Sequence, residues 1–259
     1  MSRILILKTG ETAPEVSQRH GDFDRWFIDA IRCAQAPDFP VGFDVCDVTR
    51  EPIPATDRHC GVIVTGSPKA VYNREPWMET LEEFLKGHDG RHPPVLCVCF
   101  SMQMLAHARG GRVVRNPKGW EIGGAEIRLT PAGLADPLFA GLPERFGALA
   151  THEDHVEELP KGCVLLAGNE ASPVQAFRAG DSTWGVQFHP EASVPILERL
   201  IHLRAGLLER DAALRGADAS GHVPRLIDTL ASPKVAESRR ILTNFLAICR
   251  GDGTATSGR

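Results

Sequence analysis

Four short apolar runs alternate with amphipathic segments in the first hundred residues, and this alternation leaves few folds open. Strands are predicted at 4–7, 43–48, 62–64 and 95–98. Apolar residues at helical spacing lie at 24–34, at 76–86, and from Phe100 onward. Strands that are apolar along most of their length are typical of a parallel sheet with helices on both faces. The order therefore predicts an α/β fold with three layers, α/β/α, around a mostly parallel central sheet.

The pattern changes after Gly111, where turn residues separate shorter strands. This half is expected to be rich in strands and partly antiparallel. The predicted strands are 112–115, 123–129, 146–150, 164–167, 174–177 and 183–188.

Helical spacing returns from residue 192 to residue 208, and again from 226 to 246 after the polar break RGADASGHVP. We expect residues 1–205 to form the α/β domain and residues 206–250 to form a helical extension. The tail, 251–259, is small and polar and is expected to be disordered.

Composition argues against several classes of function. The 259 residues include 29 Lys and Arg against 33 Asp and Glu, and the formal charge of −4 favours neither nucleic acid nor an anionic membrane as a partner. No apolar run approaches the roughly 20 residues that span a bilayer. Seven cysteines are too sparse, and odd in number, for a secreted disulfide framework, which predicts a cytoplasmic location.

Cys99 follows the apolar run PVLCV and precedes the helix that is predicted to begin near Phe100. It is therefore expected on a strand-to-helix turn at the carboxyl end of a central strand, where open α/β sheets bind their ligands. A cysteine on such a turn projects from the sheet, and the N-terminus of the following helix favours its thiolate. Taken alone, a cysteine is more often a small buried apolar residue.

A second segment, GVQFHPE, ends the last predicted strand with a His-Pro-Glu triplet. Pro190 favours extended backbone at His189, and residues two apart in extended backbone lie on the same side. Glu191 is therefore expected to face His189 and to orient its imidazole. A cysteine with an oriented histidine is the arrangement for acyl transfer through a thioester.

A third segment, GVIVTGSP, is a predicted strand that ends in a tight glycine turn. Such a turn can present the backbone N–H of Gly66 to the crevice beside Cys99. Together with the N–H of Phe100, it would form an oxyanion hole for a tetrahedral intermediate.

In this order, the three segments resemble the class I, triad-type glutamine amidotransferases, over about residues 4–204. PVLCVCFSMQ is similar to the family's nucleophile segment PxxGICxGxQ, and NPKGWEIG and THEDHV are also similar to family segments. Within the family, the chain most resembles stand-alone proteins described as GMP-synthase-like. The resemblance implies a flavodoxin-like sheet, and hydrolysis of the glutamine side-chain amide by Cys99, His189 and Glu191 without a metal or other cofactor.

The resemblance also assigns residues around this triad. It places Gly66 and Phe100 at the oxyanion hole and Gln103 in contact with glutamine. Asp154 is expected to bind the amino group of glutamine or an acceptor domain.

Two positions depart from the family pattern, because Cys97 and Ser101 stand where the family has glycines beside the nucleophile. Glycine lets a tight turn pack closely against its neighbours. Both replacements are small, so the turn can form, but a changed geometry would lower activity or alter the acyl group accepted. A metal site at Cys97 and Cys99 is disfavoured because no other ligand cluster matches them.

The sequence contains no GxxxxGK phosphate loop, and the residues after His222 suffice only for a helical appendage. Ammonia from glutamine would therefore pass to a separate synthase or acceptor protein. Two alternatives stay open. One is a hydrolase of γ-glutamyl peptides, which would use the same triad on the same carbonyl group, and the other is a non-catalytic regulatory subunit.

Overall fold

The computed structural model describes residues 2–34, 40–88 and 92–251 of the chain. Its centre is a nine-stranded sheet of order β2-β1-β3-β4-β11-β10-β9-β6-β7. The first five strands in this order are parallel, and they are β2 (Gly42–Asp47), β1 (Arg3–Lys8), β3 (Gly61–Val64), β4 (Val95–Val98) and β11 (Thr183–Val186). The other four are antiparallel, and they are β10 (Ala176–Ala179), β9 (Val164–Gly168), β6 (Glu121–Leu129) and β7 (Arg145–His152).

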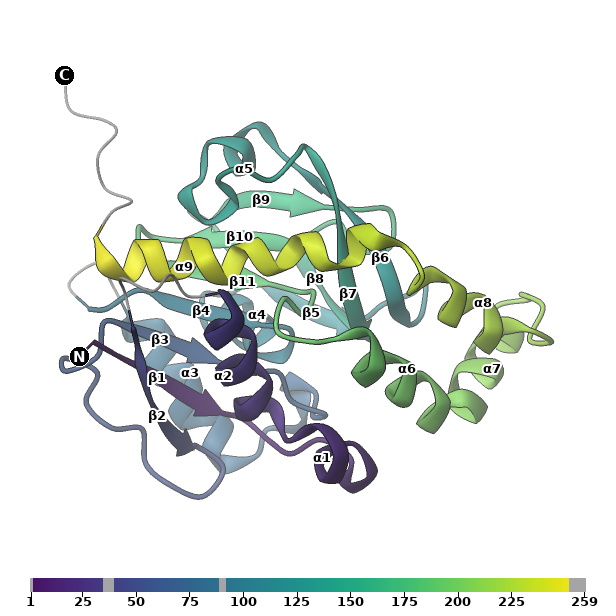
Figure 1. The fold of residues 1–259 in the computed structure, drawn as a ribbon, viewed down its shortest axis with the longest axis horizontal. Coiled ribbons are helices and arrows are strands. Elements are labelled where there is room, and N and C mark those ends of the chain that lie inside the picture. The colour runs from purple at the N-terminus through teal and green to yellow at the C-terminus, as the bar shows by residue number, and fades with distance from the viewer. Residues whose placement is uncertain (1, 35–39, 89–91, 252–259) are drawn as a thin grey trace.

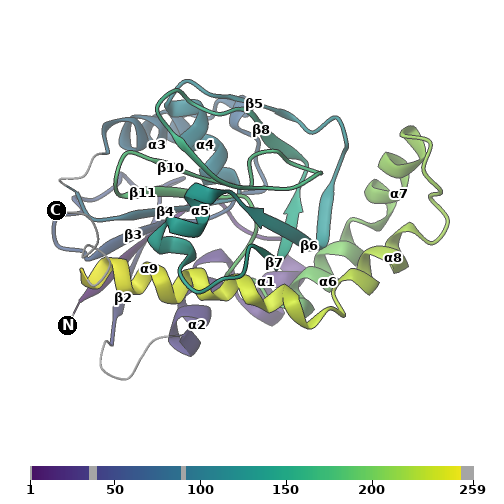
Figure 2. The ribbon, with the colours of Figure 1, turned by 90° about the horizontal axis from the view of Figure 1, so that it is seen from above.

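Helices cover both faces of this sheet (Figures 1 and 2). On one face lie α3 (Pro76–Gly87) and α4 (Phe100–Ala108), and on the other lie α2 (Phe23–Ala34) and α9 (Arg240–Arg250). Strand β1 shows why its run is apolar throughout, since Ile4 and Ile6 enter one core and Leu5 and Leu7 enter the other. The predicted three-layer α/β fold is confirmed.

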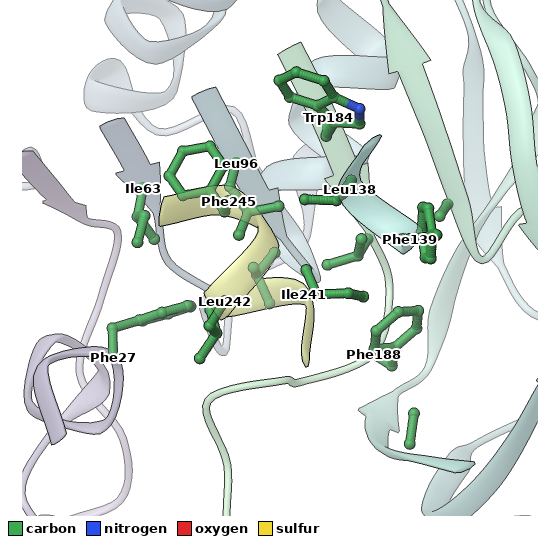
Figure 3. Packing of buried hydrophobic residues seen from close by; sticks show 14 of the residues in the cluster. Phe27, Ile63, Leu96, Leu138, Phe139, Trp184, Phe188, Ile241, Leu242 and Phe245 are labelled. Atoms are coloured by element: carbon green, nitrogen blue, oxygen red, sulfur yellow. The ribbon is translucent and has the colours of Figure 1, made fainter. Parts of the chain in front are cut away.

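The last helix, α9, belongs to the layer that covers the sheet. Ile241, Leu242 and Phe245 are buried in one cluster with Phe27 of α2 and with residues of the central strands (Figure 3). Helices α6 (Val194–Leu203), α7 (Ala205–Leu214) and α8 (His222–Thr229) lie together beside β6 and β7 (Figure 1). The predicted boundary at residue 205 stays a prediction.

Several elements differ from those predicted. The expected helix over 192–208 is two helices that meet at Arg204, whose φ of −98° and ψ of 5° interrupt the regular geometry. The strand expected at 174–177 lies two residues later, and the one expected at 183–188 ends at Val186. The expected tail, 251–259, lies outside the described residues except for Gly251.

Other elements were not predicted at all. No strand was predicted over the THEDHV segment, yet part of it is β8 (Asp154–Glu158), which pairs with β5 (Arg112–Arg115) in a separate sheet. The short helices α1 (Pro14–His20) and α5 (Pro131–Ala135), and the 3-10 helices Val71–Asn73, Pro137–Phe139 and Pro233–Arg239, are also additional. In the described part of the chain, no helix combines the length and apolar character needed to cross a membrane.

Candidate active site

Cys99 occupies the turn between β4 and α4, as the order of strand and helix predicts. Its φ of 56° and ψ of −109° are rare for a residue with a side chain, and such backbone costs on the order of 1–3 kcal/mol. The turn is held by the Cys99 N–H, which donates to the carbonyl oxygen of Val186 at 2.8 Å. Strand β11 therefore fixes the position of the cysteine from the side.

Two residues separate the His-Pro-Glu triplet from the end of β11, and the triplet contributes two buried side chains, His189 and Glu191, to the site. Nδ1 of His189 lies 2.7 Å from Oε1 of Glu191, as the extended backbone predicts. Nε2, the other ring nitrogen, is buried and has no hydrogen-bond partner among the described atoms, and the ring lies against Gly66 together with the Cys99 side chain. Burial disfavours the imidazolium, but Glu191 and the Cys99 thiolate outweigh burial and raise the pKa of His189 to about 10. The charged form of His189 is therefore favoured at neutral pH.

Gly66 follows β3 and lies against the same two side chains. A methyl group at Gly66 would come within 3.3 Å of His189 Cε1 and 3.6 Å of Cys99 Cβ. Thr9 Oγ1 donates to the Gly66 carbonyl oxygen at 2.8 Å and holds the loop. Phe100 is the first residue of α4, so its N–H has no partner within the helix.

Gln103 and Asp154 are connected to Cys99 through the side chain of Gln187. Gln103 Nε2 donates to the backbone oxygen of Asp154 at 2.9 Å and to Gln187 Oε1 at 3.1 Å. The Asp154 carboxylate accepts a hydrogen bond from Tyr72, and burial raises its pKa. Neither residue lines the cavity that contains Cys99, so their predicted contacts with glutamine stay predictions.

Sequence reasoning missed Gln187 and Arg204. Gln187 Nε2 donates to the Cys99 sulfur at 3.5 Å and links it to Gln103. Gln187 is part of GVQFHPE, where only the triplet was considered. Arg204 falls on the apolar stripe of the helix predicted over 192–208, at helical spacing from Leu200 and Leu208, and a charge in that position was an available signal.

Cys99 and His189 lie in a cavity of about 640 Å³ that opens between α1, α2 and α6. One wall is apolar and consists of Phe23 and Trp26 from α2 and Leu197, Leu200 and Leu203 from α6. The polar residues of the lining include Thr151, Arg204, Glu11 and Glu15. The cavity is therefore larger than an amide nitrogen needs, and it is mixed in character.

The glycine replacements beside Cys99 have separate surroundings. Cys97 is buried in the core on the other face of the sheet from Cys99, and burial raises the pKa of its thiol. The two sulfurs therefore do not form a pair. Across the described residues, no three His, Cys, Asp or Glu side chains are grouped to hold a metal ion. The expectation that the reaction needs no metal stays a prediction.

Ser101 fastens the turn through its hydroxyl group. Its Oγ accepts from the N–H of Val98 at 2.7 Å and donates to the Val64 carbonyl oxygen at 2.7 Å, so it joins β3 to β4. Ser101→Ala is expected to lower the free energy of unfolding by about 1–3 kcal/mol, because it leaves buried backbone groups unpaired. Urea denaturation measures this loss. The control is Ser17→Ala, which removes a solvent-accessible hydrogen bond to Pro14, and equal stability of both variants would contradict the expectation.

A cysteine on a strand-to-helix turn of an α/β fold, with a buried His–Glu pair beside it, is an arrangement that suits acyl transfer. Residues 40–198 match the family model described as glutamine amidotransferase class-I. The chain belongs to the class I glutamine amidotransferase family.

Two groups of sequence relatives differ in what they are named for. A GMP synthase (glutamine-hydrolysing) from Thermosipho melanesiensis is 37% identical over 134 residues, which are 51% of this chain and 24% of that enzyme. Gamma-glutamyl peptidase 3 from Arabidopsis thaliana is 29% identical over 162 residues, 61% of this chain and 65% of the peptidase. The chain thus spans about a quarter of the length of the GMP synthase that it matches.

Solved structures share the whole architecture. A glutamine amidotransferase from Methylobacillus flagellatus has a TM-score of 0.69 at 22% identity, with 100% of this chain and 96% of that chain covered. One from Thermotoga maritima has a TM-score of 0.67 at 21% identity, with 96% and 97% covered. At these identities the likeness concerns the fold, which is the flavodoxin-like fold expected from the sequence.

Proposed function

We propose that this chain hydrolyses the side-chain amide of glutamine through a triad of Cys99, His189 and Glu191. One observation carries the proposal. The buried imidazole of His189 is held by Glu191 at 2.7 Å and lines the same cavity as Cys99, which lies on a strained strand-to-helix turn. Strain at such a turn is expected where the position of a side chain matters for chemistry. Family membership supports the same reaction class.

The proposed reaction has two halves. The Cys99 thiolate attacks the amide carbon, and the N–H groups of Gly66 and Phe100 stabilise the oxyanion. The His189 imidazolium gives its proton to the amide nitrogen, ammonia leaves, and a glutamyl thioester remains on Cys99. His189, now neutral, takes a proton from water, which attacks the thioester and releases glutamate. The sum is glutamine plus water giving glutamate plus ammonia.

Ammonia released in this way would be used by a separate acceptor protein in the cytoplasm. The GMP synthases are named as hydrolysing glutamine, and this chain matches about a quarter of their length. We infer that the ammonia serves a synthase reaction. Gln103 and Asp154 would bind the amino-acid end of glutamine after rearrangement of their present hydrogen bonds.

A second candidate is the hydrolysis of γ-glutamyl peptides, and the cavity favours it. The acyl group and the attacked carbonyl would be the same as in glutamine, so the triad serves both reactions equally. A cavity of about 640 Å³ beside Cys99 has room for a leaving group much larger than ammonia. The Arabidopsis relatives are named for this reaction.

The test is the release of glutamate and ammonia from glutamine by the purified chain, with intact-protein mass spectrometry to detect a glutamyl thioester. Glutamate release together with a thioester on Cys99 would support the proposed triad. The same measurement with γ-glutamyl dipeptides separates the two candidates. Absence of both glutamate and thioester with every substrate would favour the non-catalytic alternative.

A further inference from the structure

Arg204 brings a positive charge into the cavity of the proposed nucleophile. It lies at the junction of α6 and α7, and its guanidinium group stacks over the Trp120 ring at 5.1 Å and donates to Thr151 Oγ1. Among the described residues no carboxylate forms an ion pair with it, and this includes Glu11 and Glu15 of the same cavity. Burial lowers the pKa of Arg204, because removing the guanidinium group from water disfavours its charged form. A partly buried cation without a carboxylate partner indicates an anionic ligand.

Arg204 lies close to the reacting atoms, because both Arg204 and Cys99 contact Thr151. Thr151 touches both groups, because its carbonyl oxygen lies 4.0 Å from the Cys99 sulfur and its hydroxyl group accepts from Arg204. The Cys99 thiolate also acts electrostatically on Arg204. A single residue, Thr151, therefore lies between Arg204 and the reacting sulfur, and a ligand anion bound by Arg204 would lie near the carbon that Cys99 attacks.

The lining of the cavity indicates which end of a substrate enters it. His189 lines the cavity, and the nitrogen that leaves must lie next to His189 to receive its proton. Gln103 and Asp154 do not line it. The leaving group, rather than the glutamyl group, is thus the part that faces Arg204 and the apolar wall.

We propose that Arg204 binds a carboxylate of the leaving group, and that the preferred substrate is a γ-glutamyl amino acid with an apolar side chain. In such a compound one carbon separates the leaving nitrogen from the carboxylate, which matches the short path from Cys99 through Thr151 to Arg204. The apolar side chain would pack against Phe23, Trp26 and Leu200. This inference rests on the proposed acyl transfer at Cys99. It favours the second candidate, hydrolysis of γ-glutamyl compounds, over glutamine and adds the identity of the leaving group.

The test compares γ-glutamyl-leucine with γ-glutamyl-leucinamide, which differ only in the leaving-group charge. The wild-type chain is expected to have a kcat/KM about 10–100 times higher for the carboxylate form, as one charge-assisted contact provides. Arg204→Met is expected to bring this ratio close to one, mainly by raising KM for γ-glutamyl-leucine. Arg204→Lys, which keeps the charge but loses the fork of donors, is expected to retain part of the ratio.

Arg199→Met is the matched control, because Arg199 lies on α6, is exposed and does not line the cavity. It should keep the wild-type ratio. A ratio of about one in the wild-type chain would overturn the inference. So would an unchanged ratio in Arg204→Met with both rates reduced, since Arg204 would then act on Cys99 or on the fold. If neither substrate nor glutamine yields glutamate or a Cys99 thioester, the proposed function fails with it.

Discussion

Replacing Cys99 with alanine is expected to abolish glutamate release from glutamine and from γ-glutamyl compounds. No other sulfur of the described residues interacts with His189, so the acyl group would have no acceptor. Loss of the nucleophile in a triad lowers kcat by as much as about 10⁶-fold, which brings turnover below detection. Glutamate release, measured beside the wild-type chain, checks the expectation. Full activity of Cys99→Ala would contradict it.

Two further variants separate loss of the sulfur from damage to the fold. Cys33→Ala changes an exposed cysteine on α2 and should leave glutamate release unchanged. Cys99→Gly should be as inactive as Cys99→Ala, yet more stable than it toward urea by about 1 kcal/mol. Glycine accepts a φ of 56° without strain, whereas alanine does not.

Glu191→Gln is expected to lower kcat by about 10²–10⁴-fold while leaving the turn at Cys99 in place. A glutamine oxygen can still accept from Nδ1 of His189, but it cannot stabilise the imidazolium. Burial, which disfavours the imidazolium, is then no longer offset by the Glu191 charge, and the pKa of His189 falls from about 10. Steady-state kinetics measure the loss. A wild-type rate in this variant would mean that Glu191 has a structural role only.

The same pair predicts how stability depends on pH. The pKa of His189 is about 10 in the folded chain, above its ordinary value of 6.5, so the folded chain binds more protons than the unfolded chain between these values. The stabilisation is fully present below pH 6.5 and is lost as the pH rises through about 10. Urea denaturation across this range should show wild-type stability falling more steeply than that of Glu191→Gln. Parallel curves would contradict this expectation.

The part of the site that could be predicted from the sequence consists of the residues that follow the parallel strands. Carboxyl ends of parallel strands share one edge of the sheet, which is why Gly66, Cys99 and His189 meet although up to 123 positions separate them. Extended backbone at Pro190 was enough to place Glu191 beside His189.

The remainder depends on tertiary packing. The charged residues in THEDHV are not typical of a strand, so β8 could not be predicted. It forms because β5 supplies a pairing partner. The cavity wall comes from α1, α2 and α6, whose relative positions leave no periodic signal. Gln103 could be assigned to glutamine by likeness, but its present partners, Asp154 and Gln187, depend on how β8 and β11 pack.

The neighbouring positions of β4 and β11 have a consequence for the order in which the chain becomes active. Val98 pairs with Val186, so the two halves of the site are 88 positions apart, and all four antiparallel strands of the central sheet lie between them. A growing chain carries its thiol long before the strand that supports Cys99 and supplies His189 has been synthesised. Pairing across such a distance forms late in folding. The onset of glutamate release would therefore indicate that the sheet is complete. The rate at which this activity appears during refolding would measure how fast the sheet is completed.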